Sequence, residues 1–200
     1  MNAPTRRARS PTDAPGPAFR VADGRFLHVV ASGALCYNVV VTVGKGKVNR
    51  EDHITWMRLA LAEATQAMEH GDIPVGAVAV REGRVVGRGH NRKEADKDPI
   101  AHAEILTLQE AARTLGGWRL VGVTLYCTLE PCPMCAGAML SARLPYLVYG
   151  ADDPKAGAAG SVVELLRDPR FNHRVAVVRG VLAKEAQELL AQFFARLRET

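Results

Sequence analysis

Two short segments, residues 99–104 and 128–135, constrain this chain more than any other feature of its sequence. The first contains His102 and the second contains Cys132 and Cys135, so together they offer one imidazole and two thiols. Three nitrogen and sulfur ligands with a fourth position left open are typical of a catalytic zinc, whereas a structural zinc is closed by a fourth protein ligand. A shared metal would require the fold to bring these segments, 30 residues apart, into contact.

Both segments also carry the signals of a helix start. Asp98 can cap a helix whose first residue is Pro99, and Pro131 can take the same first position in a second helix. Cys132 and Cys135 are three residues apart and would share one face of that helix. Thiolates at a helix N-terminus are stabilised by the positive end of the helix dipole.

Glu104 follows His102 by two residues and is a carboxylate that the ligand set does not need. His-x-Glu followed by Pro-Cys-x-x-Cys is the signature of zinc deaminases, in which the Glu transfers protons and does not bind the metal. A structural zinc knuckle, or three unrelated residues, is the alternative. The upstream His-Ala-Glu and the two helix-start signals argue against both.

The mechanism expected from this set follows from the ligands. Zinc on His102, Cys132 and Cys135 would keep one water and lower its pKa towards about 7. Glu104 would accept the water's proton, hydroxide would attack an amino-bearing ring carbon, and Glu104 would protonate the ring nitrogen and then the departing amine. Glu130 has no proton-transfer role in the signature, so a helix-capping or hydrogen-bonding role is expected.

Length and composition fit a single domain in a reducing compartment. Two hundred residues with 48% apolar content can form one domain with a sizeable core. Four cysteines are too few for a disulfide scaffold and two belong to the metal set, which favours the cytoplasm. Cys127 lies in a predicted strand and is expected in the core, while Cys36 has no evident partner.

The formal charge of +5 belongs to the N-terminal quarter of the chain. Residues 1–50 carry a net +6 and residues 51–200 a net −1, so the domain has no global field for nucleic acid. Residues 1–25 are rich in Pro, Arg, Ala and Gly and are predicted to be disordered. The apolar run at 26–43 resembles an anchor but is short and interrupted by polar residues. We therefore expect a dispensable extension over 1–50 and a zinc-dependent deaminase domain over 51–200.

From Asp52 onwards, apolar periodicity predicts alternating helices and strands. Helices are expected at 52–71, 99–116, 131–143, 161–167 and 184–198, and strands at 74–81, 84–89, 121–128, 145–150 and 174–179. The first helix would bury Ile54, Met57, Leu61, Ala64 and Met68, and the last Leu189, Leu190, Phe193, Phe194 and Leu197. The fold class is therefore α/β, a three-layer α/β/α domain with a mixed five-stranded sheet and helices on both faces. No stretch of the domain is expected to span a membrane.

Several motifs resemble those of one known family. They are residues 73–78 (Ile-Pro-Val-Gly-Ala-Val), 89–92 (Gly-His-Asn-Arg), 101–105 (Ala-His-Ala-Glu-Ile), 128–138 (Thr-Leu-Glu-Pro-Cys-Pro-Met-Cys-Ala-Gly-Ala), 155–161 (Lys-Ala-Gly-Ala-Ala-Gly-Ser), 172–174 (Asn-His-Arg) and 193–194 (Phe-Phe). On these, residues 53–198 resemble the bacterial tRNA-specific adenosine deaminases of the cytidine-deaminase-like superfamily. The last three motifs indicate the tRNA branch.

This resemblance implies conversion of adenosine to inosine at wobble position 34 of a tRNA anticodon, by a homodimer with one Zn²⁺ per subunit. It assigns His102, Cys132 and Cys135 to the metal and Glu104 to proton transfer. It also implies substrate-binding roles, as follows: Asn91 for the flipped nucleotide, Asp153 near its ribose, and Asn172 and His173 in the anticodon loop. From the residues alone, Asn91 could instead end the hairpin as a turn residue, residues 172–174 could be a polar turn, and Phe193-Phe194 could be core packing.

Two other functions remain open from the sequence. A zinc-dependent deaminase of free guanine or cytosine would share the metal set and Glu104 without needing the later motifs. A non-catalytic zinc-stabilised binding module is disfavoured, because a structural site has no use for an unligated carboxylate. The remaining histidines of the domain, His53, His70 and His90, lack metal-ligand spacing and are expected to be surface or capping residues.

Overall fold

The computed structural model describes residues 19–20, 26–27, 41–43, 46–48 and 50–199. Four short strands precede the domain and form two separate antiparallel pairs. They are β1 (Phe19–Arg20) with β2 (Phe26–Leu27), and β3 (Val41–Val43) with β4 (Gly46–Val48). Cys36, and most of the predicted disordered start and dispensable extension, lie outside the described residues and stay predictions.

The centre of the domain is a five-stranded sheet with the order β6-β5-β7-β8-β9. Its strands are β5 (Gly76–Arg81), β6 (Arg84–His90), β7 (Val123–Leu129), β8 (Tyr146–Ala151) and β9 (Ala176–Arg179). β5 pairs antiparallel with β6 and with β7, whereas β8 pairs parallel with β7 and with β9. The sheet is therefore mixed, as predicted, and the antiparallel hairpin turns at Glu82 and Gly83, which both have positive φ.

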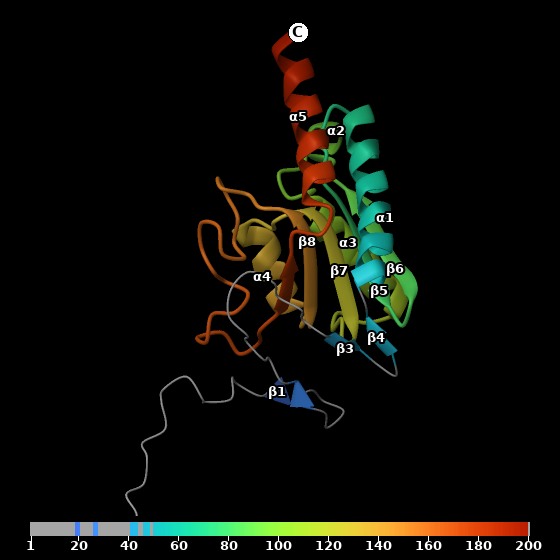
Figure 1. Ribbon diagram of the computed structural model, residues 1–200, viewed down its shortest axis with the longest axis vertical. Coiled ribbons are helices and arrows are strands. Elements are labelled where there is room, and N and C mark those ends of the chain that lie inside the picture. Colours follow the sequence, from blue (N-terminus) through green and yellow to red (C-terminus); the bar gives the residue numbers. More distant parts are fainter. Residues whose placement is uncertain (1–18, 21–25, 28–40, 44–45, 49, 200) are drawn as a thin grey trace, which may run out of the picture.

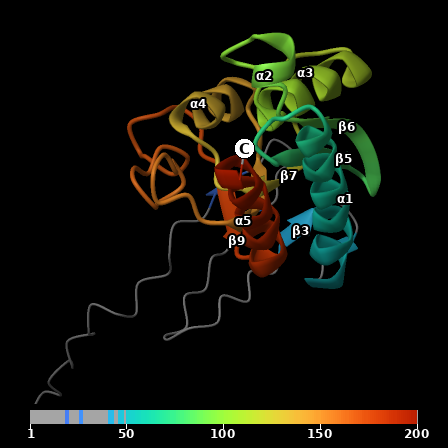
Figure 2. The ribbon, with the colours of Figure 1, turned by 90° about the horizontal axis from the view of Figure 1, so that it is seen from above.

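Helices cover both faces of this sheet. α1 (Arg50–Glu69) and α5 (Ala183–Glu199) lie on one face, and α2 (Lys93–Asp96), α3 (Ala103–Leu115) and α4 (Pro133–Ser141) lie on the other (Figures 1 and 2). The predicted three-layer α/β/α architecture is confirmed. α2 is a single turn within the segment predicted as a loop, and it begins there because the Asp72 carboxylate accepts hydrogen bonds from the backbone N–H groups of Glu94 and Ala95.

A core lies on each side of the sheet. The larger core, beneath α3 and α4, includes Leu125, Cys127, Cys135 and Met139, all fully buried. Cys127 is thus a core residue, as predicted, and its burial raises the pKa of the thiol well above its ordinary value. The smaller core, beneath α1, is built from Met57, Ala60, Val78, Val80, Tyr126 and Val148. The metal-ligand segments belong to the larger core.

The close approach of α1 to β5 changes which residues of α1 are buried. A Cβ atom on Gly76 would lie 2.2 Å from the carbonyl oxygen of Ala60 and 2.2 Å from the backbone nitrogen of Ala64, so the strand backbone rests directly on the helix. Three of the six buried positions of α1 are alanines: the buried residues are His53, Met57, Ala60, Glu63, Ala64 and Ala67. The predicted face was right for Met57 and Ala64, whereas the larger Ile54, Leu61 and Met68 are only half-buried.

Of the predicted surface histidines, His53 is buried and His90 is half-buried. His53 lies 8% exposed with its Nδ1 3.0 Å from the hydroxyl of Tyr126, and His90 places its Nδ1 3.1 Å from a carboxylate oxygen of the buried Glu63. His70 is exposed, as predicted, and its ring stacks on that of His90. Both histidines are less exposed than predicted. Each has a polar partner on another element, Tyr126 for His53 and Glu63 for His90, and the local sequence pattern does not reveal such a partner.

The last helix is only partly covered. Phe193 is buried, as expected for core packing, but Phe194 is 43% exposed and Leu197 is 55% exposed. Figure 1 shows the C-terminal part of α5 extending beyond the end of the sheet, so that its apolar side chains there have no strand beneath them. The prediction that Phe194 and Leu197 point inward was therefore wrong.

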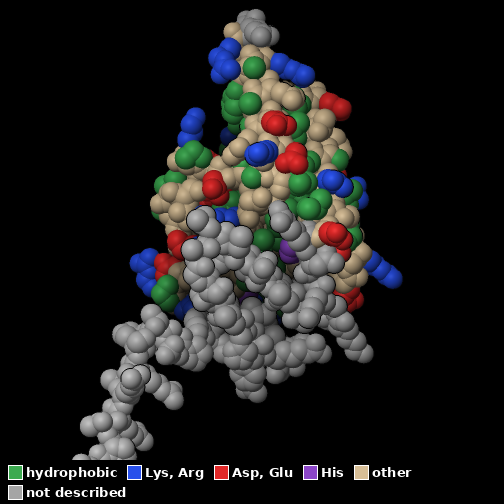
Figure 3. Space-filling model, viewed as in Figure 1, with side chains coloured by type: hydrophobic (Ala, Val, Ile, Leu, Met, Phe, Trp, Pro, Cys, Tyr) green, Lys and Arg blue, Asp and Glu red, His purple; other side chains and the backbone are tan. Residues whose placement is uncertain are grey.

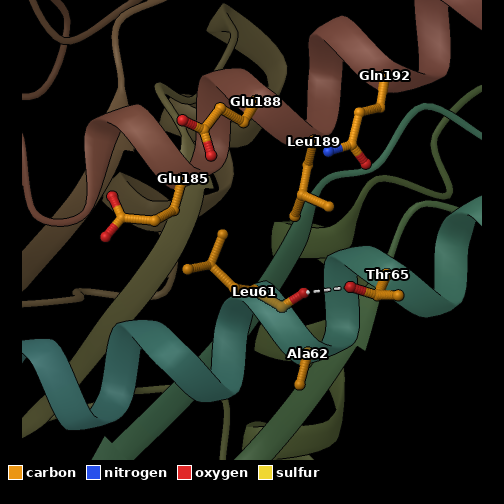
Figure 4. A pocket seen from close by; sticks show the side chains of 7 residues that line it. All are labelled: Leu61, Ala62, Thr65, Glu185, Glu188, Leu189 and Gln192. Atoms are coloured by element: carbon orange, nitrogen blue, oxygen red, sulfur yellow. Dashed lines mark hydrogen bonds between the residues drawn. The ribbon is translucent and has the colours of Figure 1, made fainter.

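The α1–α5 face has a groove and a mixed charge distribution. Lys and Arg side chains are interspersed with Asp and Glu over the described part of this face (Figure 3), in keeping with the near-neutral domain. A groove of about 320 Å³ runs between the two helices, where Leu61 and Leu189 face each other and Glu185 and Glu188 lie above them (Figure 4). Within the described part of the chain, no helix has the length and apolar character needed to cross a membrane.

Candidate active site

His102 and Cys132 each occupy the position immediately before a helix. His102 has extended backbone angles (φ −82°, ψ 150°), and its carbonyl accepts the first hydrogen bond of α3, from the N–H of Leu106. Cys132 does the same for α4, with φ −72° and ψ 171°, and accepts from Ala136. An extended residue at this position points its side chain away from the helix barrel and towards whatever lies in front of the helix.

Both helices begin a few residues later than predicted. Asp98 accepts a hydrogen bond at its side chain from the N–H of Ile100, so it closes a tight turn and does not cap α3. In α4 the first helical position is taken by Pro133 and not by Pro131. The prediction that a proline begins this helix was correct, but it named the wrong proline of the Pro-Cys-Pro sequence. Either proline is suited to the first helical position, where its missing N–H is not needed.

The three predicted ligands meet in front of these two helix starts. The Nδ1 atom of His102 lies 3.7 Å from Sγ of Cys132 and 3.6 Å from Sγ of Cys135. One ligand atom from each residue falls within 4.8 Å of the others, and among the described residues this is the one His/Cys/Asp/Glu group able to hold a metal ion. The sequence prediction that residues 30 positions apart form one metal set agrees with this geometry. The donors, one imidazole and two thiols, suit zinc.

The electrostatics of the site favour an anionic sulfur. The pKa of the Cys132 thiol is lowered to about 4 because its sulfur accepts a hydrogen bond from the Cys135 side chain and another from His102. The same sharing raises the pKa of Cys135 above its ordinary value. Two helix N-termini, those of α3 and α4, direct their positive ends towards these sulfurs. A bound divalent cation would permit both thiolates to form together.

Glu104 lies in the first turn of α3 and is 3% exposed. Burial raises the pKa of its carboxyl above the ordinary value, and the neighbouring His102 and Cys135 offset that rise only in part. A carboxyl whose pKa is raised towards neutrality can both accept and return a proton at physiological pH. Its position, two residues after His102 in the first turn of α3, brings it near the metal set without making it a member of the ligand group.

Asn91 supplies the cap that His102 cannot. The His102 side chain makes no capping hydrogen bond to α3. The Asn91 amide oxygen instead accepts from the N–H of Ala103, at 3.0 Å, and its amide nitrogen donates to the carbonyl of Ile73, at 3.1 Å. Asn91 is buried and ties the end of β6 to the start of α3. Its predicted contact with a flipped nucleotide stays a prediction.

Glu130, just before Pro131 and Cys132, confirms the expected hydrogen-bonding role. Its side chain is 2% exposed and accepts hydrogen bonds from the backbone of Asp153, Ala159 and Ser161 and from the hydroxyl of Ser161. Burial alone would raise the pKa of this carboxyl, but these bonds outweigh burial and lower it. Ser161 was not predicted as a site residue, and only its place at the end of a quoted motif marked it.

No helix forms over 161–167. The N–H groups of Ala159 and Ser161 are directed to Glu130, and the N–H groups of Val162 and Val163 both turn back to the carbonyl of Gly157. The segment consists of turns with one isolated bridge between Ala159 and Glu164. The helix predicted at 161–167 was wrong: the N–H of Leu165 donates to the carbonyl of Ala158 and the N–H of Arg167 to the side chain of Glu164, so neither makes the i→i−4 bond of a helix.

The remaining predicted substrate residues have intramolecular partners. The side chain of Asp153 accepts from the N–H groups of Lys155 and Ala156 and so folds its own loop. Asn172 accepts from the guanidinium of Arg143, at the end of α4, and the Nε2 of His173 lies 2.7 Å from the carbonyl of Leu144. These bonds agree with a polar turn before β9, and the anticodon-loop contacts stay predictions.

A three-layer fold with a His/Cys/Cys set and a buried glutamate beside it defines a zinc-type deaminase. In agreement, the family model described as "MafB19-like deaminase" matches residues 51–198. A tRNA-specific adenosine deaminase of Bacillus subtilis (strain 168) is 49% identical over 144 residues, which cover 72% of this chain and 89% of that protein.

Two solved structures of deaminases also resemble this chain. One, from a study of A-to-I editing by tRNA:A34 deaminases at the wobble position of transfer RNA, has a TM-score of 0.66 and 46% identity and covers 68% of this chain and 99% of that one. A guanine deaminase from Nitrosomonas europaea has a TM-score of 0.60 and 25% identity, covering 71% of this chain and 84% of that one. This chain belongs to the tRNA-specific adenosine deaminase family.

Proposed function

We propose that this chain hydrolyses adenosine to inosine at wobble position 34 of a tRNA anticodon. The observation that supports deamination is the convergence of His102, Cys132 and Cys135 within 4.8 Å beside the buried Glu104. The substrate is supported by the relatives: identity is 46% to the tRNA:A34 deaminase structure and 25% to the guanine deaminase. A free-base deaminase of guanine or cytosine is the alternative to be tested.

The metal set would hold one zinc ion through Nδ1 of His102 and the two sulfurs. Bound there, zinc would act as a Lewis acid that makes a water molecule reactive at neutral pH. The chain's own contribution is to hold the three donors in place: two helix N-termini stabilise the sulfurs, and Asn91 fixes the start of α3 from outside.

Glu104 would carry out the proton transfers. Its carboxylate takes a proton from the attacking water as the C6–O bond of the purine forms, and delivers it to the adjacent ring nitrogen. Glu104 then takes the proton of the new C6 hydroxyl and gives it to the amine as the C6–N bond breaks, so that C6 keeps a carbonyl oxygen and the amine leaves as ammonia. One carboxyl serves as base and then as acid because its burial raises its pKa towards the working pH.

A single-stranded RNA loop suits this site. A base within a stacked duplex hides its reacting carbon, whereas an anticodon loop already presents unstacked bases that can enter a pocket at small cost. Under this proposal Asn91, Asp153, Asn172 and His173 lie around the RNA. The near-neutral domain implies that local contacts, and not a global field, hold the substrate.

The direct test uses the purified chain, zinc, and an RNA stem-loop that carries adenosine at position 34. Digestion to nucleosides and mass spectrometry should detect inosine, while free guanine and free cytosine remain unchanged. Removing the metal with a strong chelator should abolish the reaction, and added Zn²⁺ should restore it. Turnover of guanine or cytosine with an unreacted stem-loop would establish the alternative function, and activity that survives metal removal would contradict the zinc assignment.

We also propose a homodimer located in the cytoplasm. The family resemblance supports the dimer, and large apolar side chains left exposed on the described domain, among them Ile100, Val162 and Phe171, support a further contact surface. Sedimentation at micromolar concentration would measure the dimer, and a monomer throughout that range would contradict it.

A further inference from the structure

The carboxylate of Glu130 joins two parts of the site that are separate in sequence. Its Oε1 accepts from the N–H of Ala159, at 2.9 Å, and from the N–H of Ser161, at 3.1 Å. Its Oε2 accepts from the N–H of Asp153, at 3.0 Å, and from the Ser161 hydroxyl. The loop that follows β8 is therefore held at both of its ends, residues 153 and 161, by one side chain.

The loop also packs directly on this carboxylate. A Cβ on Gly157 would lie 2.4 Å from the carboxyl carbon of Glu130, which leaves no room for any side chain. The next residue, Ala158, donates its N–H to the carbonyl of Pro131 at 2.8 Å, immediately before Cys132. Ala158 and Ala159 are buried in the same core as Cys135. The inner half of the loop thus rests on the metal-ligand segment.

The outer half of the loop is free to meet a substrate. Asp152, Pro154, Lys155 and Ala156 are exposed and Asp153 is half-buried. Glu130 itself is anchored to the sheet, since its backbone N–H donates to the carbonyl of Ala151 at the end of β8. A rigid connection therefore runs from the sheet through Glu130 to both the Cys132 segment and the exposed residues of the loop.

We propose that Glu130 is a positioning residue that sets the distance between the metal-ligand segment and the outer surface of the 153–161 loop, and so sets how tightly the RNA substrate is held. The substrate named here rests on the proposed function. Glu130 neither binds the metal nor transfers a proton in this role. It acts through the backbone of Asp153 and Ala159, which it fixes in place.

The chemistry explains why this position needs a carboxylate. All four groups that face Glu130 are used as donors, and three are backbone N–H groups that cannot reverse. The Glu130→Gln amide would keep one acceptor oxygen but would point an NH₂ group at one backbone donor. With the oxygen kept by Ala159 and Ser161, the NH₂ would face the N–H of Asp153. The substitution therefore releases the Asp153 end of the loop while nearly preserving side-chain volume.

The test compares the zinc-loaded wild type with Glu130→Gln in two independent measurements. Amide hydrogen exchange over residues 152–163 should be at least about tenfold faster in the variant, as expected for the loss of one buried hydrogen bond, while α1 and β5 exchange as before. With the adenosine-34 stem-loop, KM should rise by about tenfold and kcat should change much less. Zinc content should stay equal to that of the wild type.

A second variant approaches the contact from the loop side. Gly157→Ala pushes a methyl group against the carboxylate and should give the same faster exchange and raised KM, even if Glu130→Gln does not fold. Gly137→Ala is the matched control, since Gly137 lies in α4 with no atom within 4 Å of an added Cβ. It should leave loop exchange, KM and kcat unchanged.

Three results would overturn the proposal. One is unchanged loop exchange in both Glu130→Gln and Gly157→Ala. Another is loss of zinc in Glu130→Gln with the loop still protected, since Glu130 would then act on the metal ligands. The third is a fall in kcat with KM unchanged. If the wild type does not deaminate the stem-loop, the proposed function fails, but the exchange measurement still decides whether Glu130 holds the loop.

Discussion

At the scale of single residues, the site divides its polar groups between chemistry and support. His102, Cys132 and Cys135 form the metal set, so the side-chain hydrogen bond that caps α3 comes from Asn91.

The two buried glutamates, Glu104 and Glu130, differ in the hydrogen-bond donors around them. Burial of Glu104 raises its pKa and outweighs its backbone hydrogen bond and its contacts with His102 and Cys135. Glu130 is surrounded by donors that lower its pKa. These environments agree with the proton transfer proposed for Glu104 and with a supporting role for Glu130.

Replacing Glu104 tests this division. Glu104→Gln keeps the shape of the buried side chain but cannot accept a proton, so deamination should fall by roughly 100-fold or more while zinc remains bound. Inosine formation and metal content of the same preparation measure both effects. Glu188→Gln, on the exposed face of α5, is the control and should behave as wild type. Full activity in Glu104→Gln would rule out its role as proton shuttle.

At the scale of elements, the site is formed by the N-termini of α3 and α4 and is supported by the close contact between α1 and β5. β6 and β7 both pair antiparallel with β5, so they end at the same edge of the sheet, and the helices α3 and α4 that follow them begin there. α1 seats β5 from the opposite face, backbone against backbone, through Gly76. The antiparallel pairing of β5 with β6 and the length of the hairpin then bring Asn91 to the start of α3.

Gly76→Ala should be strongly destabilising. An added methyl group would meet backbone atoms of α1 at 2.2 Å, which no side-chain rotation can relieve. Overpacking of a core usually costs 1–3 kcal/mol, and we expect a loss at or above about 3 kcal/mol here. Urea unfolding measures the change in the free energy of unfolding. Gly117→Ala, where an added Cβ meets nothing within 4 Å, should differ little from wild type, and equal stability of the two variants would refute the argument.

At the scale of the whole molecule, the sheet separates a catalytic face from a supporting one. The larger core and the metal set lie beneath α3 and α4, and the smaller core lies beneath α1. The groove between α1 and α5 is on the supporting face, across the sheet from the metal set (Figures 2 and 4). His53 and Tyr126 connect α1 to the central strand β7 through the smaller core.

That connection predicts a pH dependence of stability. Burial lowers the pKa of His53 below 6.5, so the folded state favours the neutral imidazole. Its contribution is complete above about pH 6.5 and is lost as pH falls from there towards the folded-state pKa, because the unfolded chain takes up the proton first. The slope from this group is at most about 1.4 kcal/mol per pH unit.

His53→Asn can still offer a polar atom near the position of Nδ1, but it does not titrate. The free energy of unfolding, measured between pH 5 and 7.5, should therefore vary less steeply in His53→Asn than in the wild type. The other histidines and the metal ligands contribute equally to both proteins and cancel in the difference. Parallel pH profiles would show that His53 does not titrate on unfolding in this range.

The sequence by itself determined the features that depend on local pattern. Ligand spacing identified His102, Cys132 and Cys135, their nearby carboxylate was recognised as Glu104, and apolar periodicity predicted all five strands of the sheet with its hairpin. Each of these features depends on the residue types and spacing within a short segment, so the sequence was enough to predict it.

Only the tertiary structure decided the features that depend on distant partners. The cap from Asn91, the buried His53 and the attachment of the 153–161 loop to Glu130 all follow from hydrogen bonds between segments far apart in the chain. Folding places the Glu130 carboxylate among the backbone donors of the 153–161 loop, and nothing in the local pattern indicates that partner. A local pattern lists which hydrogen bonds a segment can make, and the fold selects which of them are made.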